Sequence, residues 1–231
     1  MSSFLSFGRS PRRIAEADSV AVIGLGRFGT SLALELMASG TDVLGVDVDE
    51  DIVQSLNGEL TQVVRADTTK LEVLEQLGIG DFDRVVVSIG SDITASILTA
   101  SLLLRLEVPV IWAKAVDERH GAVLEQLGVH RVISPEKDMG RRVAHLVRGA
   151  AADYLEIDRG FAVVKTVAPQ LLHGVTLAAA GVRATYGITI AAHRTEHGEW
   201  ANATPETVLG PGDTVLVVGP IHRVEHFAQL R

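Results

Sequence analysis

The sequence predicts an α/β fold in which a doubly wound parallel sheet is followed by a long helix and a small α+β domain. Three observations lead to this prediction. Short runs rich in valine and isoleucine alternate with helical segments from Ser19 to Ser134, a pattern typical of parallel sheets with both faces covered. A glycine-rich turn, GLGRFG, follows the first run directly. After Tyr154 the pattern changes to short strands separated by Gly and Pro, which indicates a second, smaller unit.

The first unit is expected to alternate strand and helix along its whole length. The apolar runs predict strands at 19–24, 42–47, 60–65, 84–90, 108–116 and 131–134. The segments between them predict helices that include 32–37, 52–56, 71–77, 93–106 and 119–127. Gly40 stands where the first helix should end. Because the connections are short and the strand–helix alternation is strict, each helix should lead back to a parallel strand of the same sheet.

Two nearly identical segments, LEQLGI at 74–79 and LEQLGV at 124–129, end helices of this unit. Each combines an amphipathic last turn with a glycine, which can adopt the left-handed conformation that terminates a helix. We interpret them as one local device used twice, because two copies are too few for a repeat protein.

The second part begins with a helix that the pattern extends from Pro135 to about Ala152. Strands then follow in FAVVKTV, YGITIAAHR and DTVLVVG, and His193 and His197 flank a predicted hairpin turn rather than lie on one helical face. The predicted organisation is a flexible tail at 1–18, a nucleotide-binding domain at 19–134, a connecting helix at 135–154 and a C-terminal domain at 155–231.

Composition excludes several classes of function. The 231 residues carry 21 Lys and Arg against 29 Asp and Glu, a net charge of −8, which argues against nonspecific binding to nucleic acid. The absence of cysteine excludes disulfides, cysteine metal sites and cysteine nucleophiles. The longest stretch without a charged residue, 166–182, is short for a membrane span. The N-terminus lacks the apolar run of a signal peptide, so a soluble, cytoplasmic protein is expected.

The glycine-rich turn predicts a nucleotide site. Gly24, Gly26 and Gly29 form G-x-G-x-x-G between a strand and a helix, and Asp47 ends the next strand. In this Rossmann-like context the first glycine permits a tight turn, the second allows close approach of a phosphate, and the third allows helix and strand to pack closely. A carboxylate at Asp47 can accept hydrogen bonds from ribose hydroxyls and would repel a 2′-phosphate. The alternative is a tight turn that binds no ligand.

Further candidates lie in the turn or at the carboxyl ends of strands, where ligands bind in doubly wound sheets. Arg27 would add a forked donor beside phosphates, or is simply an exposed residue of the first helical turn. Asp67 either contacts the ligand or caps the next segment, and Lys114 either reaches the crevice or extends to solvent. The remaining candidate ligand residues are Phe28, Asp49, Ser88 and Gly90.

No catalytic set is visible, so the chain is not expected to be an enzyme. A short-chain dehydrogenase needs a Tyr followed four residues later by a Lys. This pattern is absent, because Tyr154 is followed at that spacing by Asp158 and Tyr186 by Ile190. Neither H-E-x-x-H nor G-x-S-x-G occurs. An NAD-dependent oxidoreductase nevertheless stays open as the alternative function, and nicotinamide turnover would distinguish the two.

The residues together resemble a known family. VAVIGLGRFG, Asp47, SIG at 88–90, IWAKA at 111–115 and SPEKDMG at 134–140 resemble the RCK-domain (regulator of potassium conductance) subunits of bacterial potassium-uptake systems of the Trk/Ktr type. The resemblance covers nearly all of 19–231 and is weaker in the C-terminal domain, where 205–219 carries it.

The resemblance implies a nucleotide-gated, non-enzymatic regulator at the cytoplasmic face of the membrane. Homodimers would assemble into a ring, often of eight subunits in this family, beneath a membrane potassium channel or transporter subunit. ATP or ADP is the first choice of ligand and NAD(H) the second. Arg27 would match a phosphate-contacting arginine, and the helix after Pro135 a crossover helix exchanged between partners.

The same resemblance implies two further sites. Glu136 would match an acid that binds a divalent cation or Na⁺ at the dimer interface, although Ser134, Pro135 and Glu136 also make a good helix start. Cyclic di-AMP binds the C-terminal domain of some relatives, but no contact residues for it can be matched here. A regulatory module of another ion transporter shares this architecture and remains a further alternative.

Overall fold

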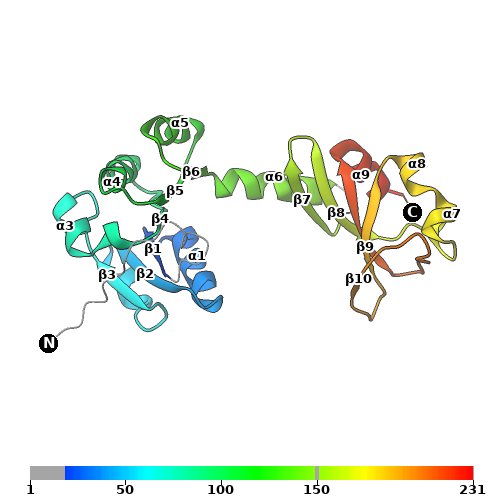
Figure 1. The fold of residues 1–231 in the computed structure, drawn as a ribbon, viewed down its shortest axis with the longest axis horizontal. Coiled ribbons are helices and arrows are strands. Elements are labelled where there is room, and N and C mark those ends of the chain that lie inside the picture. Colours follow the sequence, from blue (N-terminus) through cyan, green and yellow to red (C-terminus); the bar gives the residue numbers. More distant parts are fainter. Residues whose placement is uncertain (1–18, 149–150, 231) are drawn as a thin grey trace. The chain divides into compact units, whose positions relative to one another are not determined.

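The computed structural model describes residues 19–148 and 151–230, which form two compact units divided between Pro135 and Glu136 (Figure 1). The predicted tail at 1–18 lies outside the described residues. In chain order the elements of the first unit are β1 (Ser19–Ile23), α1 (Arg27–Ala38), β2 (Asp42–Asp47), α2 (Glu50–Ser55), β3 (Gln62–Arg65), α3 (Leu71–Gln76), a 3₁₀ turn (Ile79–Asp81), β4 (Arg84–Val87), α4 (Ile93–Arg105), β5 (Val110–Lys114), α5 (Glu118–Leu127) and β6 (Arg131–Ile133).

The first unit contains one parallel sheet in the order β3-β2-β1-β4-β5-β6. The central strand β1 pairs with β2 and with β4 in parallel register. The chain therefore reverses its direction of winding beside β1, and the crevice at that point is where doubly wound sheets bind ligands. This arrangement confirms the predicted fold class.

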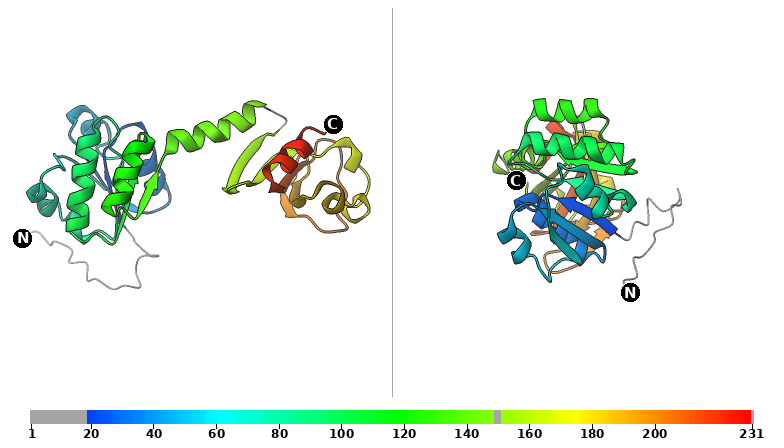
Figure 2. Two further views of the ribbon diagram at one scale, coloured as in Figure 1. Left: turned by 90° about the horizontal axis from the view of Figure 1, so that it is seen from above. Right: turned by 90° about the vertical axis from the view of Figure 1, so that its left-hand side faces the viewer.

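Both faces of the sheet are buried, as the continuous apolar runs predict. On one face Ala21 and Ile23 of β1 pack in a cluster with residues of α3, α4 and α5. On the other face Val20 and Val22 pack with Ala33 of α1 and with Leu56. Because successive side chains of a strand point to opposite faces, β1 contributes to both layers, and helices flank the sheet on its two sides (Figures 1 and 2).

The two LEQLG segments end their helices in the predicted way. Gly78 after α3 has φ +65° and Gly128 after α5 has φ +95°, the left-handed conformation that favours glycine. The continuation differs between them, because the 3₁₀ turn separates Gly78 from β4, whereas β6 follows Gly128 after two residues.

The second unit is a five-stranded sheet in the order β10-β9-β11-β8-β7, and its pairs are antiparallel. Its core contains Tyr154, Leu172, Val215 and Phe227 among other residues. In chain order its elements are α6 (Pro135–Arg148), β7 (Asp153–Asp158), β8 (Phe161–Val167), a 3₁₀ turn (Gln170–Leu172), α7 (Leu177–Ala180), α8 (Val182–Tyr186), β9 (Thr189–Arg194), β10 (Trp200–Asn202), β11 (Thr214–Pro220) and α9 (Ile221–Ala228).

The predicted extent of the helix after Pro135 is wrong at its C-terminal end. Sequence analysis extends the helix to about Ala152 and the connecting segment to 154, but β7 already begins at Asp153. The amide of Ala152 donates to the carbonyl of Lys165, so sheet pairing has replaced helical hydrogen bonding at that point.

Helix α6 is attached to its own unit by polar and ring contacts. Arg142 pairs with Asp153 at 2.7 Å, and this contact lowers the pKa of the Asp153 carboxyl. His145 Nδ1 lies 2.5 Å from Glu225 Oε1 of α9, and the His145 ring stacks on Tyr154 at 4.0 Å between centroids. No helix within 19–148 and 151–230 is long and apolar enough to cross a membrane.

A buried histidine is expected to make the stability of the first unit depend on pH. His120 of α5 is 2% exposed, and its Nδ1 accepts the amide of Val116 at 3.3 Å. Its Nε2 is buried without a hydrogen-bond partner among the described residues. Burial lowers the pKa of the imidazole, and the carboxylate of Asp117 opposes this only in part. The neutral form is therefore the one that the folded chain favours.

We expect the free energy of unfolding to fall as pH drops below about 6.5, the ordinary pKa of histidine. Below that pH the unfolded chain binds a proton that folded His120 resists, so stability falls until the pH reaches the lowered pKa of folded His120, and it stays at the lower value below that pH. His120→Asn retains a side-chain acceptor for the Val116 amide but does not titrate, so it should flatten this dependence. Urea unfolding at several pH values measures it, and identical slopes for both proteins would contradict the assignment.

Candidate functional site

The glycine-rich turn joins the end of β1 to the start of α1 at the middle of the parallel sheet. Gly24 has φ +90°, a conformation that L-residues with a side chain rarely adopt. A Cβ at Gly24 would lie 2.8 Å from the backbone nitrogen of Ile89. The tight turn thus requires glycine here for both conformation and space.

Gly29 lies in the first turn of α1 and is packed against the backbone of Gly24. A Cβ at Gly29 would lie 1.9 Å from the carbonyl oxygen of Gly24 and 2.4 Å from Ser88 Oγ. The Ser88 hydroxyl donates to the Gly24 carbonyl in turn. Gly29 is therefore required by the packing of the chain itself.

Gly26 differs from the other two glycines. Its backbone, at φ −64° and ψ −172°, is extended and open to most residue types. A Cβ placed on it would meet nothing within 4 Å. Within the chain, neither conformation nor packing demands glycine at this position, although the bare backbone leaves room for an approaching ligand.

Helix α1 begins at this turn with an uncompensated N-terminus. Its N-cap is Gly26, which supplies no side-chain hydrogen bond, and its first turn carries no acidic residue. The first intrahelical bond runs from the Thr30 amide to the Gly26 carbonyl at 2.9 Å. The preceding amides and the positive end of the helix dipole favour an anionic group here.

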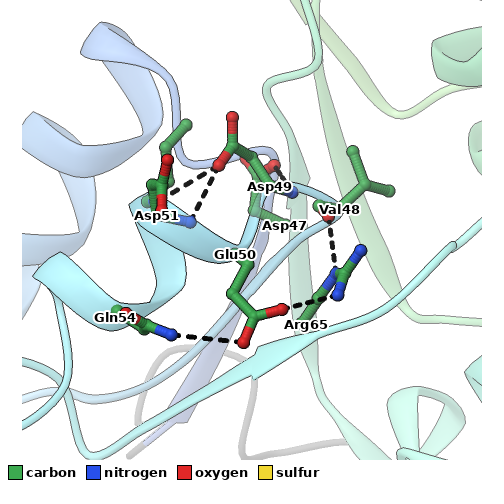
Figure 3. Close-up of polar contacts among 8 residues, drawn as sticks. Asp47, Val48, Asp49, Glu50, Asp51, Gln54 and Arg65 are labelled. Carbon is green, nitrogen blue, oxygen red and sulfur yellow. Dashed lines mark hydrogen bonds and ion pairs between the residues drawn. The ribbon is translucent and has the colours of Figure 1, made fainter.

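Asp47 lies at the end of β2 beside the turn, and the chain holds its carboxylate in place. Oδ2 accepts the amide of Leu25 at 2.6 Å, and Oδ1 accepts the amide of Asp49 at 3.0 Å. Figure 3 shows Asp47 among the acidic residues of the segment that follows β2. An ionised carboxylate has about four lone-pair sites, so two such bonds leave capacity for ribose hydroxyls.

Asp49 and Asp67 have local structural roles. Asp49 caps α2 by accepting the amides of Asp51 at 2.9 Å and Ile52 at 3.4 Å. Asp67 accepts the amide and the hydroxyl of Thr69 and pairs with Lys70 at 3.1 Å. The Thr69 hydrogen bonds, followed by the contact with Lys70, lower the pKa of the Asp67 carboxyl. The geometry thus favours the capping interpretation of Asp67 over ligand contact.

Three other candidates lie close together beside the glycine-rich turn. Lys114 ends β5, and its Nζ lies 5.8 Å from the ring centroid of Phe28. A Cβ on Gly90 would lie 3.3 Å from the same Nζ. Lys114 therefore extends toward the glycine-rich turn rather than away from it. Arg27 is exposed at the first position of α1.

The predicted cation ligand Glu136 belongs to the second unit. It lies in the first turn of α6 together with Asp138. The described residues contain no group of three or more His, Asp or Glu side chains arranged to hold a metal ion. Within the described residues, Glu136 is therefore not part of such a group.

Two features were not predicted from the sequence. Ser88 is 5% exposed and bonded to Gly24, which makes it a support of the turn rather than an accessible ligand residue. Arg65 ends β3, in register with Asp47, and pairs with Glu50 at 2.6 Å. Arg65 lies beside Asp47 because β3 pairs with β2, and the carboxyl ends of neighbouring parallel strands lie at one edge of the sheet.

Residues 20–135 match the TrkA-N domain family, and residues 162–230 match the TrkA-C domain family. The chain is 38% identical over 208 residues to the Ktr system potassium uptake protein C of Bacillus subtilis, covering 90% of this chain and 94% of that protein. It is 35% identical over 203 residues to the Ktr system potassium uptake protein A of Vibrio alginolyticus, covering 87% and 91% respectively.

A solved structure described as the GsuK channel bound to NAD is similar in fold, with a TM-score of 0.65 and 17% identity. The similarity covers 92% of this chain and 39% of that chain, so this chain corresponds to less than half of the channel protein.

Proposed function

Because this chain belongs to the TrkA-N and TrkA-C family of potassium-uptake regulatory proteins, we propose that it is a nucleotide-sensing subunit that controls a membrane potassium transporter. The nucleotide would bind in the first unit, with its phosphates at the N-terminus of α1. The resulting change in conformation would be transmitted to the transport subunit. We propose regulation rather than catalysis, since the sequence offers no catalytic set around the turn.

The observation that carries the proposal is the open space at Gly26. Gly24 and Gly29 are explained by the conformation and packing of the chain, whereas Gly26 is explained by neither. A ligand phosphate lying against a bare backbone beside an uncapped helix N-terminus accounts for glycine at this position.

ATP and ADP are our first choice of ligand, and NAD(H) is the second. NAD(H) is included because a solved structure of similar fold is described as the GsuK channel bound to NAD. Asp47 would accept hydrogen bonds from the ribose, and Arg27 and Lys114 would offer positive charge to the phosphates. Phe28 and Gly90 would line the site beside Lys114. Ser88 would support the turn through its hydrogen bond to the Gly24 carbonyl.

We further propose that the chain acts as a homodimer within a ring, with eight subunits as the expected number, at the inner face of the membrane. Three exposed apolar residues of α6 support dimerisation: Met139, Val143 and Val147 are 53%, 44% and 81% exposed. Their spacing of four places them on one face of the helix, where a second copy would cover them. This fits a crossover helix formed by α6, which lies in the chain between the proposed nucleotide-binding domain at 19–134 and the C-terminal domain at 155–231.

A cation at Glu136 belongs to the same proposal, because the two-fold symmetry of a dimer would bring a second Glu136 to the interface. One carboxylate is too few ligands for a hard cation, whereas two could complete a site together with water.

The test is to identify the nucleotide that copurifies with the full chain by mass spectrometry, and then to titrate ATP, ADP, NAD⁺ and NADH by calorimetry. Cyclic di-AMP is added as a probe of the C-terminal domain. We expect saturable binding of at least one adenine nucleotide and no oxidation of NADH with candidate substrates. Absence of binding by all four nucleotides would refute the proposal, and substrate-dependent turnover would favour an oxidoreductase.

Arg27 should distinguish ATP from ADP. The amides of the first turn of α1 can serve two phosphates, whereas a third phosphate adds charge that needs another partner. Arg27→Ala is therefore expected to reduce ATP affinity roughly tenfold to hundredfold and ADP affinity much less. Calorimetric titration of both nucleotides measures the difference, with Arg27→Lys as the control that keeps the charge. Equal losses for the two nucleotides would make Arg27 a general phosphate anchor.

A further inference from the structure

An arginine and a glutamate meet beside the proposed ribose position. Arg65 is the last residue of β3, and its Cα is paired in register with Asp47. Its Nε donates to the carbonyl of Val48 at 3.1 Å, and its Nη1 donates to Glu50 Oε2 at 2.6 Å. Figure 3 shows the guanidinium held between these two groups. The arginine paired in register with Asp47 is thus bonded to the segment that follows β2.

Glu50 is held from both sides. Its Oε2 accepts from Arg65, and its Oε1 accepts from the side-chain amide of Gln54 at 3.2 Å, one turn along α2 (Figure 3). The two charged side chains remain exposed, at 60% for Arg65 and 55% for Glu50. An ion pair this exposed contributes little to stability, so the fold should tolerate its removal. The main effect of the Arg65–Glu50 pair is on the distribution of charge at the carboxyl ends of β2 and β3.

That distribution bears on which ribose the site accepts. In dinucleotide-binding folds the acid after the second strand binds a free 2′-hydroxyl, whereas a nearby arginine accommodates a 2′-phosphate. Here both groups are present, since Asp47 ends β2 and Arg65 ends the neighbouring strand. Glu50 offsets the charge of the arginine, so the charges of Asp47 and Asp49 stay uncompensated. A 2′-phosphate would meet these two carboxylates and an arginine that is already engaged.

We propose that Glu50 is a specificity-determining residue that restricts the site to nucleotides with a free 2′-hydroxyl, because it holds Arg65 away from the 2′-position. The inference rests on the proposed nucleotide function and names the ligand class: ATP, ADP and NAD(H), but not NADP(H). Asp47 supplies the hydrogen bond to the ribose, and Glu50 withholds the arginine that would otherwise bind a phosphate.

The test uses pairs of nucleotides that differ only by the 2′-phosphate: NADH with NADPH, and AMP with adenosine 2′,5′-bisphosphate. The full chain should bind the first member of at least one pair much more tightly than the second. Glu50→Gln keeps the size of the side chain and removes its charge. It should raise the affinity for the 2′-phosphate member up to about fivefold, because an exposed ion pair worth about 1 kcal/mol or less no longer engages Arg65. The affinity for the first member should change by less than about twofold, because Glu50 makes no contact with a free 2′-hydroxyl in the proposed site.

Two controls separate the arginine from charge in general. Asp51→Asn removes a carboxylate from the same turn of α2, and Asp51 contributes its amide rather than its carboxylate to the bonds around Asp49. It should produce little or no gain for the 2′-phosphate member. The double variant Glu50→Gln with Arg65→Met should lose the gain of the single variant.

Three results would overturn the inference while leaving the proposed function intact. They are an unchanged preference in Glu50→Gln, an equal gain in Asp51→Asn, and a gain that persists without Arg65. Wild-type protein that binds the 2′-phosphate nucleotides as well as their partners would also refute it. If the wild-type protein binds no adenine nucleotide at all, the proposed function itself fails, and this inference fails with it.

Discussion

Replacing Gly26 with valine is expected to abolish nucleotide binding while leaving the fold intact. The backbone of Gly26 is extended and a Cβ there meets nothing within 4 Å, so the folded chain should lose about 1 kcal/mol or less through the poorer N-cap. The branched side chain would fill the space that a phosphate needs beside the first turn of α1. We expect affinity to fall at least ~100-fold, equivalent to about 2.7 kcal/mol.

Calorimetric titration and thermal unfolding of the same preparations measure the two effects separately. Gly26→Ala is the matched control, because its single methyl group should cause a smaller, graded loss of affinity. Unaltered affinity in the valine variant would mean that phosphates do not lie at Gly26, and the proposed site would have to be abandoned.

The opposite result is expected at Gly29, three residues later. A Cβ there would lie 1.9 Å from the Gly24 carbonyl oxygen, which is backbone and cannot rotate away. Helix α1 would have to move from the turn, and overpacking of this kind costs roughly 3 kcal/mol. Gly29→Ala should therefore lower the Tm of the first unit by roughly 10 °C.

Circular dichroism during heating measures the shift. Two further variants test its cause. Gly140→Ala makes the same substitution in α6 at a position where a Cβ meets nothing within 4 Å, and it should stabilise the helix slightly. Adding Ser88→Ala to Gly29→Ala should not restore stability, because the clash with the Gly24 carbonyl remains. Normal stability of Gly29→Ala would show that α1 is free to move.

The sequence was sufficient to predict the parallel sheet, because local signals determine it. Buried strands need continuous apolar runs, and the turn at Gly24 needs a glycine at positive φ. The family resemblance also rested on short motifs such as VAVIGLGRFG, and the TrkA-N match over 20–135 confirms it. The end of α6 was predicted incorrectly, because the competing signal, the pairing of Ala152 with Lys165, comes from β8 and not from the helical segment itself.

The candidate site was predicted in outline and not in detail. Which glycine serves the ligand follows only from atoms brought close by folding, such as the Gly24 carbonyl beside Gly29. The same limit applies to Asp49 and Asp67. Their carboxylate oxygens accept backbone amides of the following residues, and the sequence does not show which acidic residues are engaged in this way. Arg65 was missed because its significance depends on being the register partner of Asp47.

The bracing of the glycine-rich turn has a consequence for how binding energy is used. Ser88 holds the Gly24 carbonyl, and Asp47 holds the Leu25 amide at 2.6 Å, so the turn is already ordered before any nucleotide arrives. Ligands that must order a loop lose part of their interaction energy in doing so. If the chain binds a nucleotide as proposed, that loss would be avoided, and more of the free energy of association would remain to shift the equilibrium between conformations of the proposed assembly. A pre-ordered glycine-rich turn is therefore suited to a sensor that distinguishes nucleotides by the conformation of the assembly that each one stabilises.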